Sequence, residues 1–214
     1  MSEDELLLER LFDEEKFTDK QKKIIVAAIE SFSEKGYAAT STSEIAKKAG
    51  VAEGTIFRHY KTKKELLISI VAPLMTKLIG PIIVNDFHKV LDQPYEKAED
   101  FLRATIENRR EVIKKLLPVI KIMIQEIPFQ PELKEQFLDQ IAKKVFDRIL
   151  IVIKGYQDKG QLIEMPTLSA ARLAISSIFG FLLSRYIFFP DSDWDDELEI
   201  ERTVQFIMHG LGKK

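Results

Sequence analysis

The sequence predicts an all-α protein in which three short N-terminal helices precede a larger helical domain. Apolar residues recur at three- and four-residue spacing along almost the whole chain, which is the period of an amphipathic helix. No stretch of useful length alternates as a β-strand does, and no Asn-Gly or Asp-Gly hairpin signal is present. The 214 residues are 45% hydrophobic and 31% charged, a composition typical of a globular protein.

The first helix is expected over residues 18–35, because apolar residues line one face and Thr18 is a suitable N-cap. Two shorter helices are expected over residues 42–49 and 53–60. Gly50 separates these two helices, since glycine commonly ends a helix.

A longer helix is expected to start near Lys63. A proline inside a helix removes a backbone hydrogen bond and clashes with the preceding turn, so Pro73 is expected to kink this helix and Pro81 is a candidate for its end. Residues 91–97 are interpreted as a connection. The second half then contains five helical segments bounded by proline, glycine and acidic turn signals, at residues 98–117, 118–127, 131–158, 167–188 and 194–211.

Basic residues are concentrated near the start of the chain. Residues 20–66 contain ten Lys and Arg against five acidic residues, although the formal charge of the whole chain is −2. Such a segment is typical of a nucleic-acid contact, and the alternative is a solvated, lysine-rich face. The acidic extension over residues 1–17 is interpreted either as an extra amphipathic helix or as a frayed tail.

Catalytic and metal-binding chemistry find little support in the composition. The absence of cysteine excludes disulfides, thiolate zinc sites and cysteine nucleophiles, and three histidines leave little room for an imidazole metal cage. The acidic run at residues 191–197 lacks the glycine and the glutamate that an EF-hand loop requires at its sixth and twelfth positions. We therefore expect no enzymatic activity, no metal and no cofactor.

Targeting signals are also missing from the pattern. The first residues are acidic where a secretory peptide is basic, and their apolar run is short. The charge-free stretch between Arg172 and Arg185 is shorter than the ~20 apolar residues that span a bilayer. The sequence therefore predicts a soluble, cytoplasmic protein.

The most informative segment runs from residue 36 to residue 67. Gly50 permits the left-handed turn that a tight connection between two helices needs. The spacing turns five side chains inward: Ile45, Ala46, Ala49, Ile56 and Tyr60. Four polar side chains are then left mostly outward: Glu53, Thr55, Arg58 and His59. Helix, short glycine-containing turn and helix make up the helix-turn-helix unit, whose second helix enters the major groove of DNA.

This segment resembles the DNA-binding region of TetR-type (tetracycline-repressor-type) transcription regulators. The residues that match the pattern of that family are Gly36-Tyr37, Thr40-Ser41-Thr42, Ile45-Ala46, Ala49-Gly50-Val51, Gly54-Thr55-Ile56-Phe57, Tyr60, Lys63 or Lys64, and Leu66 or Leu67. The segment departs from the pattern at two positions. Ala52 replaces the usual serine, which removes a side-chain cap and a phosphate-contacting hydroxyl, and Tyr60 replaces the usual phenylalanine.

The resemblance implies an all-α fold of about nine helices, a homodimer, and an effector pocket in the larger domain. It divides the chain into the extension 1–17, a helix-turn-helix domain 18–64 with its motif at 41–60, and an effector-binding and dimerisation domain 65–214. The implied function is a ligand-responsive transcriptional repressor that binds a palindromic operator in double-stranded DNA and is released by a small, largely apolar effector. The alternative is a helical small-molecule or lipid-binding protein, or an enzyme, with an incidental basic segment.

Roles at the DNA follow as hypotheses from the matched positions. Phosphate contacts are assigned to Thr42, the Gly54 N–H, Phe57, His59 and Lys63. Base edges are assigned to Thr55, Arg58 and Glu53. For Glu53 the alternative is that it stabilises the helix N-terminus through the helix dipole.

Polar residues that interrupt apolar stripes in the larger domain are candidates for an effector site. Asn108, Arg109 and Arg148 are candidates to hold the head of an otherwise apolar ligand, and Met123 and Phe179 are candidates to line the cavity. The alternative is that the polar groups bond between helices and the apolar ones are plain core. Small residues along 167–188, together with the apolar face of 194–211, predict a dimeric four-helix interface, with packing inside one chain as the alternative.

Overall fold

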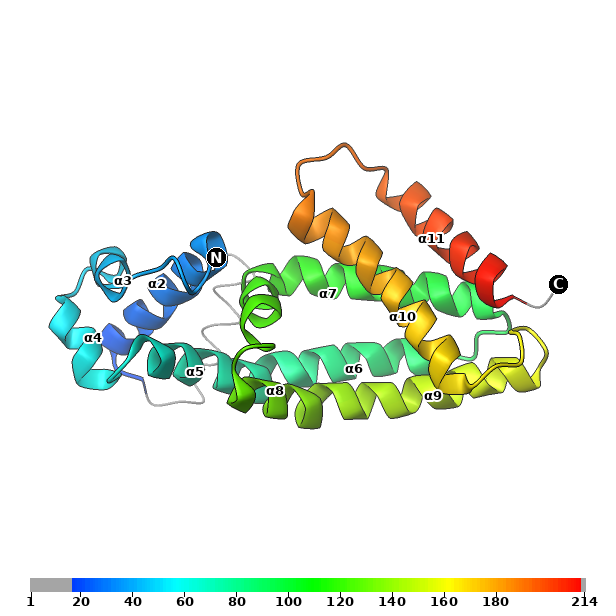
Figure 1. Cartoon of the computed structure of the whole chain (residues 1–214), viewed down its shortest axis with the longest axis horizontal. Helices are drawn as coiled ribbons and strands as arrows, with labels where there is room; N and C mark the ends of the chain where they lie inside the picture. The colour runs from blue at the N-terminus through cyan, green and yellow to red at the C-terminus, as the bar shows by residue number, and fades with distance from the viewer. Residues whose placement is uncertain (1–16, 213–214) are drawn as a thin grey trace. The chain divides into compact units, whose positions relative to one another are not determined.

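The computed structural model describes residues 17–212, and within them it is all-α, which confirms the expected class (Figure 1). Within the described residues, Leu162 and Gly212 form an isolated antiparallel β-bridge, which is not part of a strand. The extension expected over residues 1–17 lies, except for Phe17, outside the described residues. The helices form two compact units, each of which is described separately below.

The first unit comprises the described residues up to Ile82 together with Lys115–Ile141. Its first helix, α2 (Asp19–Lys35), begins and ends where the sequence predicts. The Thr18 hydroxyl accepts a hydrogen bond from the Gln21 N–H, and the Gln21 side chain accepts one from the Thr18 N–H, so the start of α2 carries a complete capping box.

The core of this unit is formed by the inward faces of α2, α3 (Thr42–Ala49), α4 (Glu53–His59) and α5 (Lys63–Pro73). The largest fully buried side chains on these helices are Phe32, Ile24, Ile25, Ile45, Ile56, Leu66, Leu67 and Ile70. Because α3 and α4 are only eight and seven residues long, their stability depends on this shared core.

The helix that starts at Lys63 does not end at Pro81. It continues through a π-helical stretch, η1 (Leu74–Ile79), into α6 (Gly80–Leu91). The π turn shifts the hydrogen bonds by one residue, so that the Gly80 N–H donates to the Met75 carbonyl, and a Cβ at Gly80 would lie 2.5 Å from that oxygen. Proline is tolerated here because the ordinary hydrogen-bond ladder is already interrupted. The expectation that Pro81 ends the helix was therefore wrong.

The helices expected at 98–117 and 118–127 form one element with a kink, α7 (Ala98–Glu126). The kink lies at Leu116, whose φ of −114° and ψ of 15° are not helical, two residues before Pro118. The segment expected at 131–158 is also confirmed, as α8 (Pro131–Phe137), the π stretch η2 (Leu138–Ala142) and α9 (Lys143–Asp158).

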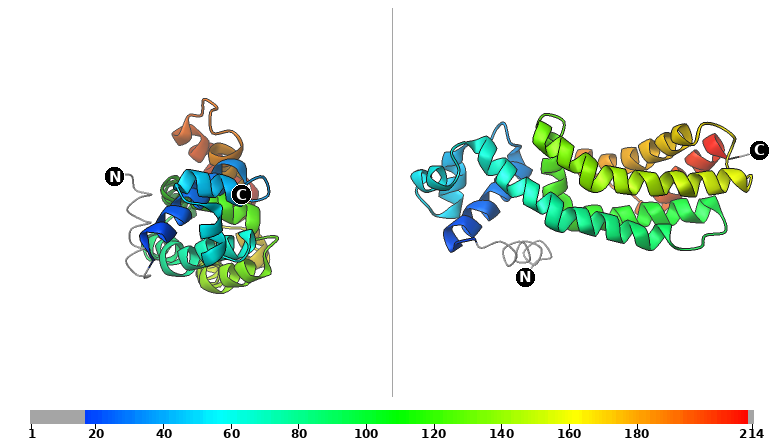
Figure 2. Two further views of the ribbon diagram at one scale, coloured as in Figure 1. Left: turned by 90° about the vertical axis from the view of Figure 1, so that its left-hand side faces the viewer. Right: turned by 90° about the horizontal axis from the view of Figure 1, so that it is seen from below.

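The second unit comprises Ile83–Lys114 and the described residues from Ala142 onward. In it α9 leads through the loop of residues 159–166 into α10 (Thr167–Leu183), which the π stretch η3 (Ser184–Phe188) extends (Figure 2). The last helix, α11 (Asp196–Leu211), packs along α10, and Asp195 caps its start by accepting from the Leu198 N–H.

Two helices pass a simple test of length and apolar composition for membrane spans: Lys63–Leu91 and Thr167–Phe188. Core helices of soluble proteins pass the same test, so this finding is weak evidence for a membrane location.

Candidate nucleic-acid interface

The turn between α3 and α4 has the geometry that a helix-turn-helix requires. Gly50 has a φ of +67° and a ψ of 34°, in the left-handed region that favours glycine. The Gly50 N–H donates to Lys47 O and the Val51 N–H donates to Ala46 O, so two carbonyls of the last turn of α3 are satisfied. The start of α3 carries a capping box between Ser41 and Glu44. Both ends of α3 are therefore fixed by residues visible in the sequence.

The second helix of the motif, α4, presents its polar face outward. Ile56 and Tyr60 are buried, as expected. Glu53, Gly54, Phe57 and Arg58 are exposed, while Thr55 and His59 are half-buried. Ala52 makes no side-chain cap, which leaves the N-terminus of α4 without a hydroxyl partner.

Thr42 and Glu53 contact each other instead of pointing separately to solvent. The Thr42 hydroxyl donates a hydrogen bond of 2.6 Å to the Glu53 carboxylate. This bond links the first residue of α3 to the first residue of α4. Two residues that the sequence assigned to different partners on DNA are thus joined within the protein.

Lys63 lies with its ammonium against the turn between α2 and α3. Its Nζ lies 2.8 Å from both Tyr37 O and Thr40 O, and 3.4 Å from Ala38 O. It also lies 4.4 Å from the centre of the Tyr37 ring. The sequence assigned the Lys63 ammonium to a DNA phosphate. In this structure the same ammonium is bonded to backbone carbonyls of the protein.

Several other basic side chains of the first unit are paired with carboxylates. Lys35 lies 2.7 Å from Glu44, and Lys48 contacts both Glu30 and Glu34. The hydrogen bond from the Lys35 ammonium, with further bonds from Ser41, lowers the pKa of Glu44 to about 2. Among the described residues, Lys47, Arg58 and Lys61 have no carboxylate within 4.0 Å of their charged groups.

Of the five candidate effector residues, Asn108 and Arg109 contact each other. Arg109 is half-buried in the second unit, where its guanidinium lies 4.7 Å from the centre of the Phe87 ring and donates to Ile83 O and to the side chain of Asn108. Burial lowers the pKa of Arg109 to about 10, which still leaves it charged at neutral pH. One helical turn earlier, the buried Thr105 hydroxyl has no hydrogen-bond partner within residues 17–212.

The remaining three candidates each have different surroundings. Arg148 is exposed and pairs with Asp92, and Phe179 is 50% exposed on α10. Met123 is buried in the first unit, so it belongs to a different unit from the other four.

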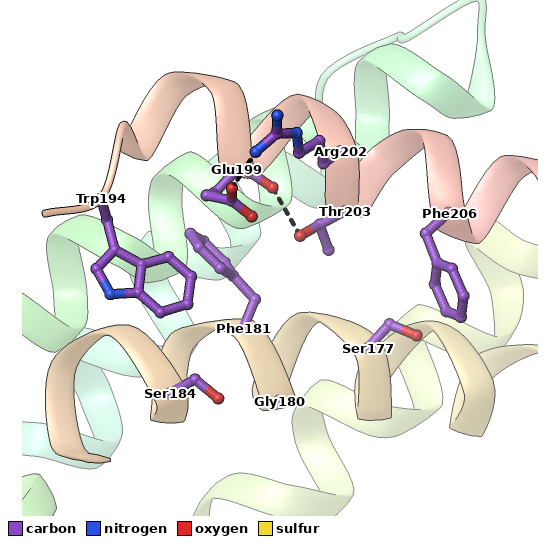
Figure 3. A pocket seen from close by; sticks show the side chains of 9 residues that line it. All are labelled: Ser177, Gly180, Phe181, Ser184, Trp194, Glu199, Arg202, Thr203 and Phe206. Atoms are coloured by element: carbon purple, nitrogen blue, oxygen red, sulfur yellow. Dashed lines mark hydrogen bonds and ion pairs between the residues drawn. The ribbon is translucent and has the colours of Figure 1, made fainter. Parts of the chain in front are cut away.

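A cavity of about 310 Å³ lies between α10 and α11 (Figure 3). Its aromatic wall is formed by Phe181, Trp194 and Phe206. Glu199, Arg202 and Thr203 line the α11 side, where Arg202 donates to the Glu199 carboxylate and the Thr203 hydroxyl donates to the Glu199 carbonyl. The residues on the α10 side are small: Ser177, Gly180 and Ser184.

Beside this cavity a polar cluster fixes the start of α11. Asp196 accepts hydrogen bonds from Arg185 (2.6 Å) and from the Tyr186 hydroxyl (3.0 Å). Burial, together with the Asp196 carboxylate, raises the pKa of Tyr186 well above its usual range. Sequence reasoning missed this cluster, because the sequence shows only isolated polar residues on either side of a turn.

Comparison with known proteins identifies the class that this geometry defines. The profile of the family described as "Bacterial regulatory proteins, tetR family" matches residues 24–70. That of "AefR-like transcriptional repressor, C-terminal domain" matches residues 100–208. The chain belongs to the TetR family, as the resemblance implied. The matched families and the named relatives are transcriptional regulators and not enzymes.

Named relatives agree with this assignment. The Bacillus subtilis "Fatty acid metabolism regulator protein" is 45% identical over 60 residues, an alignment that spans 28% of this chain and 31% of that protein. A second relative, "Uncharacterized HTH-type transcriptional regulator YvdT", is matched over 40% of its length. "Uncharacterized HTH-type transcriptional regulator YvkB", also from Bacillus subtilis, is 47% identical over 170 residues, covering 77% of this chain and 82% of that protein.

Solved structures share the fold. The TetR family transcriptional regulator PfmR from Thermus thermophilus aligns with a TM-score of 0.66 at 22% identity, over 89% of this chain and 99% of that one. The transcriptional regulator FadR from Bacillus subtilis, in complex with stearoyl-CoA, aligns with a TM-score of 0.62 at 22% identity, over 88% and 97%. At this identity the likeness concerns the fold.

Proposed function

We propose that this regulator is a repressor that binds a near-palindromic operator as a homodimer and leaves it when a largely apolar effector binds. The observation that carries the DNA-binding part is the left-handed turn at Gly50, which holds α4 against α3 with Arg58 and Phe57 outward. Each subunit would place α4 in one major groove, with half-sites about 34–36 Å apart.

The residues proposed to contact DNA, on α4 and at the start of α3, divide into two groups by chemistry. Arg58 is exposed, lacks a carboxylate partner among the described residues, and carries the fork of donors that suits guanine, so it would read a base edge. Thr55 and Glu53 are the other candidates for base edges. The Gly54 N–H, His59, Phe57 and Thr42 would contact the backbone and set the register of α4 on the duplex.

The face formed by α10 and α11 supports the proposed dimer. Large apolar side chains are exposed along these helices and the segment that joins them: Leu168, Leu173, Phe179, Phe188, Phe189, Leu198 and Phe206. Exposed apolar surface of this extent on one element pair is typical of an interface. A second copy would cover it and fill the cavity between the two helices, since a two-fold interface brings the same face of both subunits together.

For the effector, Arg109 and its neighbours are the best supported candidates. Among the described residues, no carboxylate lies within 4.0 Å of the half-buried Arg109 guanidinium, and the buried Thr105 hydroxyl has no hydrogen-bond partner. An anionic or carbonyl head group would supply the missing acceptor. The relative named as a fatty acid metabolism regulator, and the neighbour solved with stearoyl-CoA, favour a fatty acyl compound.

The effector proposal is tested by titrating palmitoyl-CoA, palmitate and hexadecanol into the full-length protein by calorimetry. Arg109→Met should weaken binding of the anionic ligands at least tenfold and leave hexadecanol unchanged. Lys154→Met, which removes an exposed lysine paired with Asp158, is the control. Equal binding of all three ligands to both variants would contradict the role of Arg109.

DNA binding is tested by footprinting the purified protein on the DNA that flanks its own gene. We expect protection of two half-sites one helical turn apart, and an affinity that falls steeply with salt because phosphate contacts release counterions. Affinity that does not respond to salt would instead favour a helical binding protein with an incidental basic segment. The proposed location is the cytoplasm, where a DNA-binding regulator works.

A further inference from the structure

The turn that joins α2 to α3 is held by side chains distant from it in sequence. The Thr40 hydroxyl, on a residue only 2% exposed, lies 2.8 Å from Gly36 O and 3.1 Å from Ser31 O and shares its single proton between these two acceptors. Lys63 donates to Tyr37 O and to Thr40 O, both at 2.8 Å. Two side chains thus contact four backbone carbonyls in and beside this turn.

The ammonium of Lys63 has no donor left over in this arrangement. A lysine ammonium has three N–H groups, and here the Tyr37, Thr40 and Ala38 carbonyls lie at 2.8, 2.8 and 3.4 Å. The charge also lies 4.4 Å from the centre of the Tyr37 ring, where the ring face attracts a cation. A phosphate could bind this ammonium only if it left these carbonyls.

Because of where Lys63 lies in the fold, its contacts bear on the placement of α4, the helix proposed to enter the major groove. Lys63 is the first residue of α5, directly after the N-cap Thr62. The turn that it holds ends at Ser41, the N-cap of α3, and α3 packs on α4. Lys63 therefore connects the start of α5 to the segment that places α3 and α4.

We propose that Lys63 is a positioning residue of the DNA-binding unit, which clamps the turn at residues 36–40 onto the start of α5 and makes no contact with DNA phosphate. This role rests on the DNA binding proposed above, and it replaces the phosphate contact that the sequence resemblance implied for Lys63. The turn carbonyls, and not the DNA backbone, are the partners of its charge.

Two neighbouring lysines differ from Lys63 and serve as comparisons. Lys61, two residues earlier, is exposed, and no carboxylate lies within 4.0 Å of its ammonium among the described residues. Lys64, the next residue, pairs with Glu132 on α8 at 3.2 Å. Lys61 is therefore the matched control, because it shares the loop and the charge but not the clamp.

The first experiment uses the wild-type full-length protein and needs no variant. Reductive methylation followed by peptide mass spectrometry measures the reaction rate of each amine, with and without a duplex DNA at low salt. We expect Lys63 to react at least fivefold more slowly than Lys61 in the free protein, and DNA to leave its rate unchanged. A smaller difference in the free protein, or protection of Lys63 by DNA, would overturn the proposal.

The second experiment compares the salt dependence of DNA binding for Lys63→Met and Lys61→Met. The slope of log K against log salt is negative, and each lost phosphate contact reduces its magnitude by about 0.9. We expect Lys63→Met to bind DNA at least tenfold more weakly at every salt concentration, with an unchanged slope and a lowered Tm, while Lys61→Met keeps the wild-type Tm. A slope whose magnitude is smaller by about 0.9 in Lys63→Met would overturn the proposal.

The two experiments separate this inference from the proposed function. If the wild-type protein bound no duplex DNA, the proposed function would fail, and the methylation rates of the free protein would still decide whether the Lys63 ammonium is engaged by the turn. If Lys63→Met does not fold, the wild-type methylation rates give the same decision.

Discussion

The hydroxyl of Thr42 and the carboxylate of Glu53 lie 2.6 Å apart and join the N-termini of α3 and α4. Both helices are short, so a link between their first residues restrains the angle between them. It also fixes one carboxylate oxygen of Glu53, which otherwise would be free to turn toward a base or away from it.

This link predicts a measurable coupling between the two residues. A double-mutant cycle of Thr42→Val and Glu53→Ala, followed by urea unfolding, should give an interaction free energy of about 0.5–1 kcal/mol, at the low end for a charged hydrogen bond because the pair is exposed. Additive single effects would show that the bond does not contribute in solution.

Arg58 is predicted to carry base discrimination. Arg58→Ala should reduce the preference for guanine at one operator position by about 1–3 kcal/mol, because a bidentate arginine contact is lost. Binding to a panel of operators that differ at single positions measures this preference. If Arg58→Ala weakened binding equally to every DNA sequence, Arg58 would be a backbone contact. Lys47→Ala, which removes an exposed lysine of α3, is the comparison.

The two glycines of the motif should respond oppositely to alanine. Gly50→Ala is expected to lower the free energy of unfolding by about 1 kcal/mol, because a φ of +67° strains any residue with a Cβ, although the space around it is open. Gly54→Ala should leave stability unchanged or raise it by up to about 1 kcal/mol, because Gly54 is helical and its surroundings are also open.

The Gly54→Ala variant is also predicted to differ from wild type in its affinity for DNA. Gly54→Ala should weaken binding to duplex DNA despite its unimpaired stability, because the added methyl group keeps the α4 backbone away from phosphate. Thermal unfolding and DNA titration on the same preparation separate the two effects. Unchanged affinity would show that the Gly54 N–H does not approach the DNA.

Glu44 is predicted to make stability depend on pH in the acid range. Its pKa is lowered to about 2 in the folded protein, first by the hydrogen bond from Lys35, against an ordinary value of 4.5. Because the folded state favours the ionised form, this contribution is complete above about pH 5 and is lost as the pH falls toward 2. Glu44→Gln keeps the capping-box geometry but removes the charge.

The expected result is a small stability difference between wild type and Glu44→Gln at pH 7 that shrinks as the pH is lowered from 5 toward 2. Urea unfolding across that range measures it. A constant difference at all pH values would show that the Lys35 pair does not act through the charge of Glu44.

Phe206 is predicted to lie in the dimer interface. It is 72% exposed on α11, and a glutamate there would have to be buried without a partner when two copies meet. Phe206→Glu should therefore shift sedimentation from dimer to monomer. Ile151→Glu, which changes a side chain of similar exposure (67%) on α9, should leave the dimer intact. Dissociation by both variants, or by neither, would contradict the proposed face.

The parts of the fold that depend on neighbours in sequence could be predicted. Thr18, Ser41 and Gly50 act within three or four residues along the chain, so the ends of α2 and α3 followed from local chemistry. The π stretch after Pro73 could not be predicted, because its stability depends on packing that periodicity does not reveal.

The candidate site shows the same division. The outward face of α4 followed from helical spacing, since burying Ile56 and Tyr60 leaves Arg58 exposed. The role of Lys63 did not follow, because its carbonyl partners lie 23 to 26 residues earlier in the chain. The sequence shows that this position carries a positive charge, but the groups that the charge contacts are known only from the folded structure.

Trp194 is the single tryptophan of the sequence, and it lies against Phe181. Its indole N–H is buried and has no hydrogen-bond partner in the part of the chain that the structure describes. Intrinsic fluorescence excited at the indole band therefore reports on the junction of α10 and α11 alone. The emission wavelength and the quenching by iodide would report any change in the solvent exposure of Trp194, such as its burial by a second subunit or a ligand, without a label and without altering the chain.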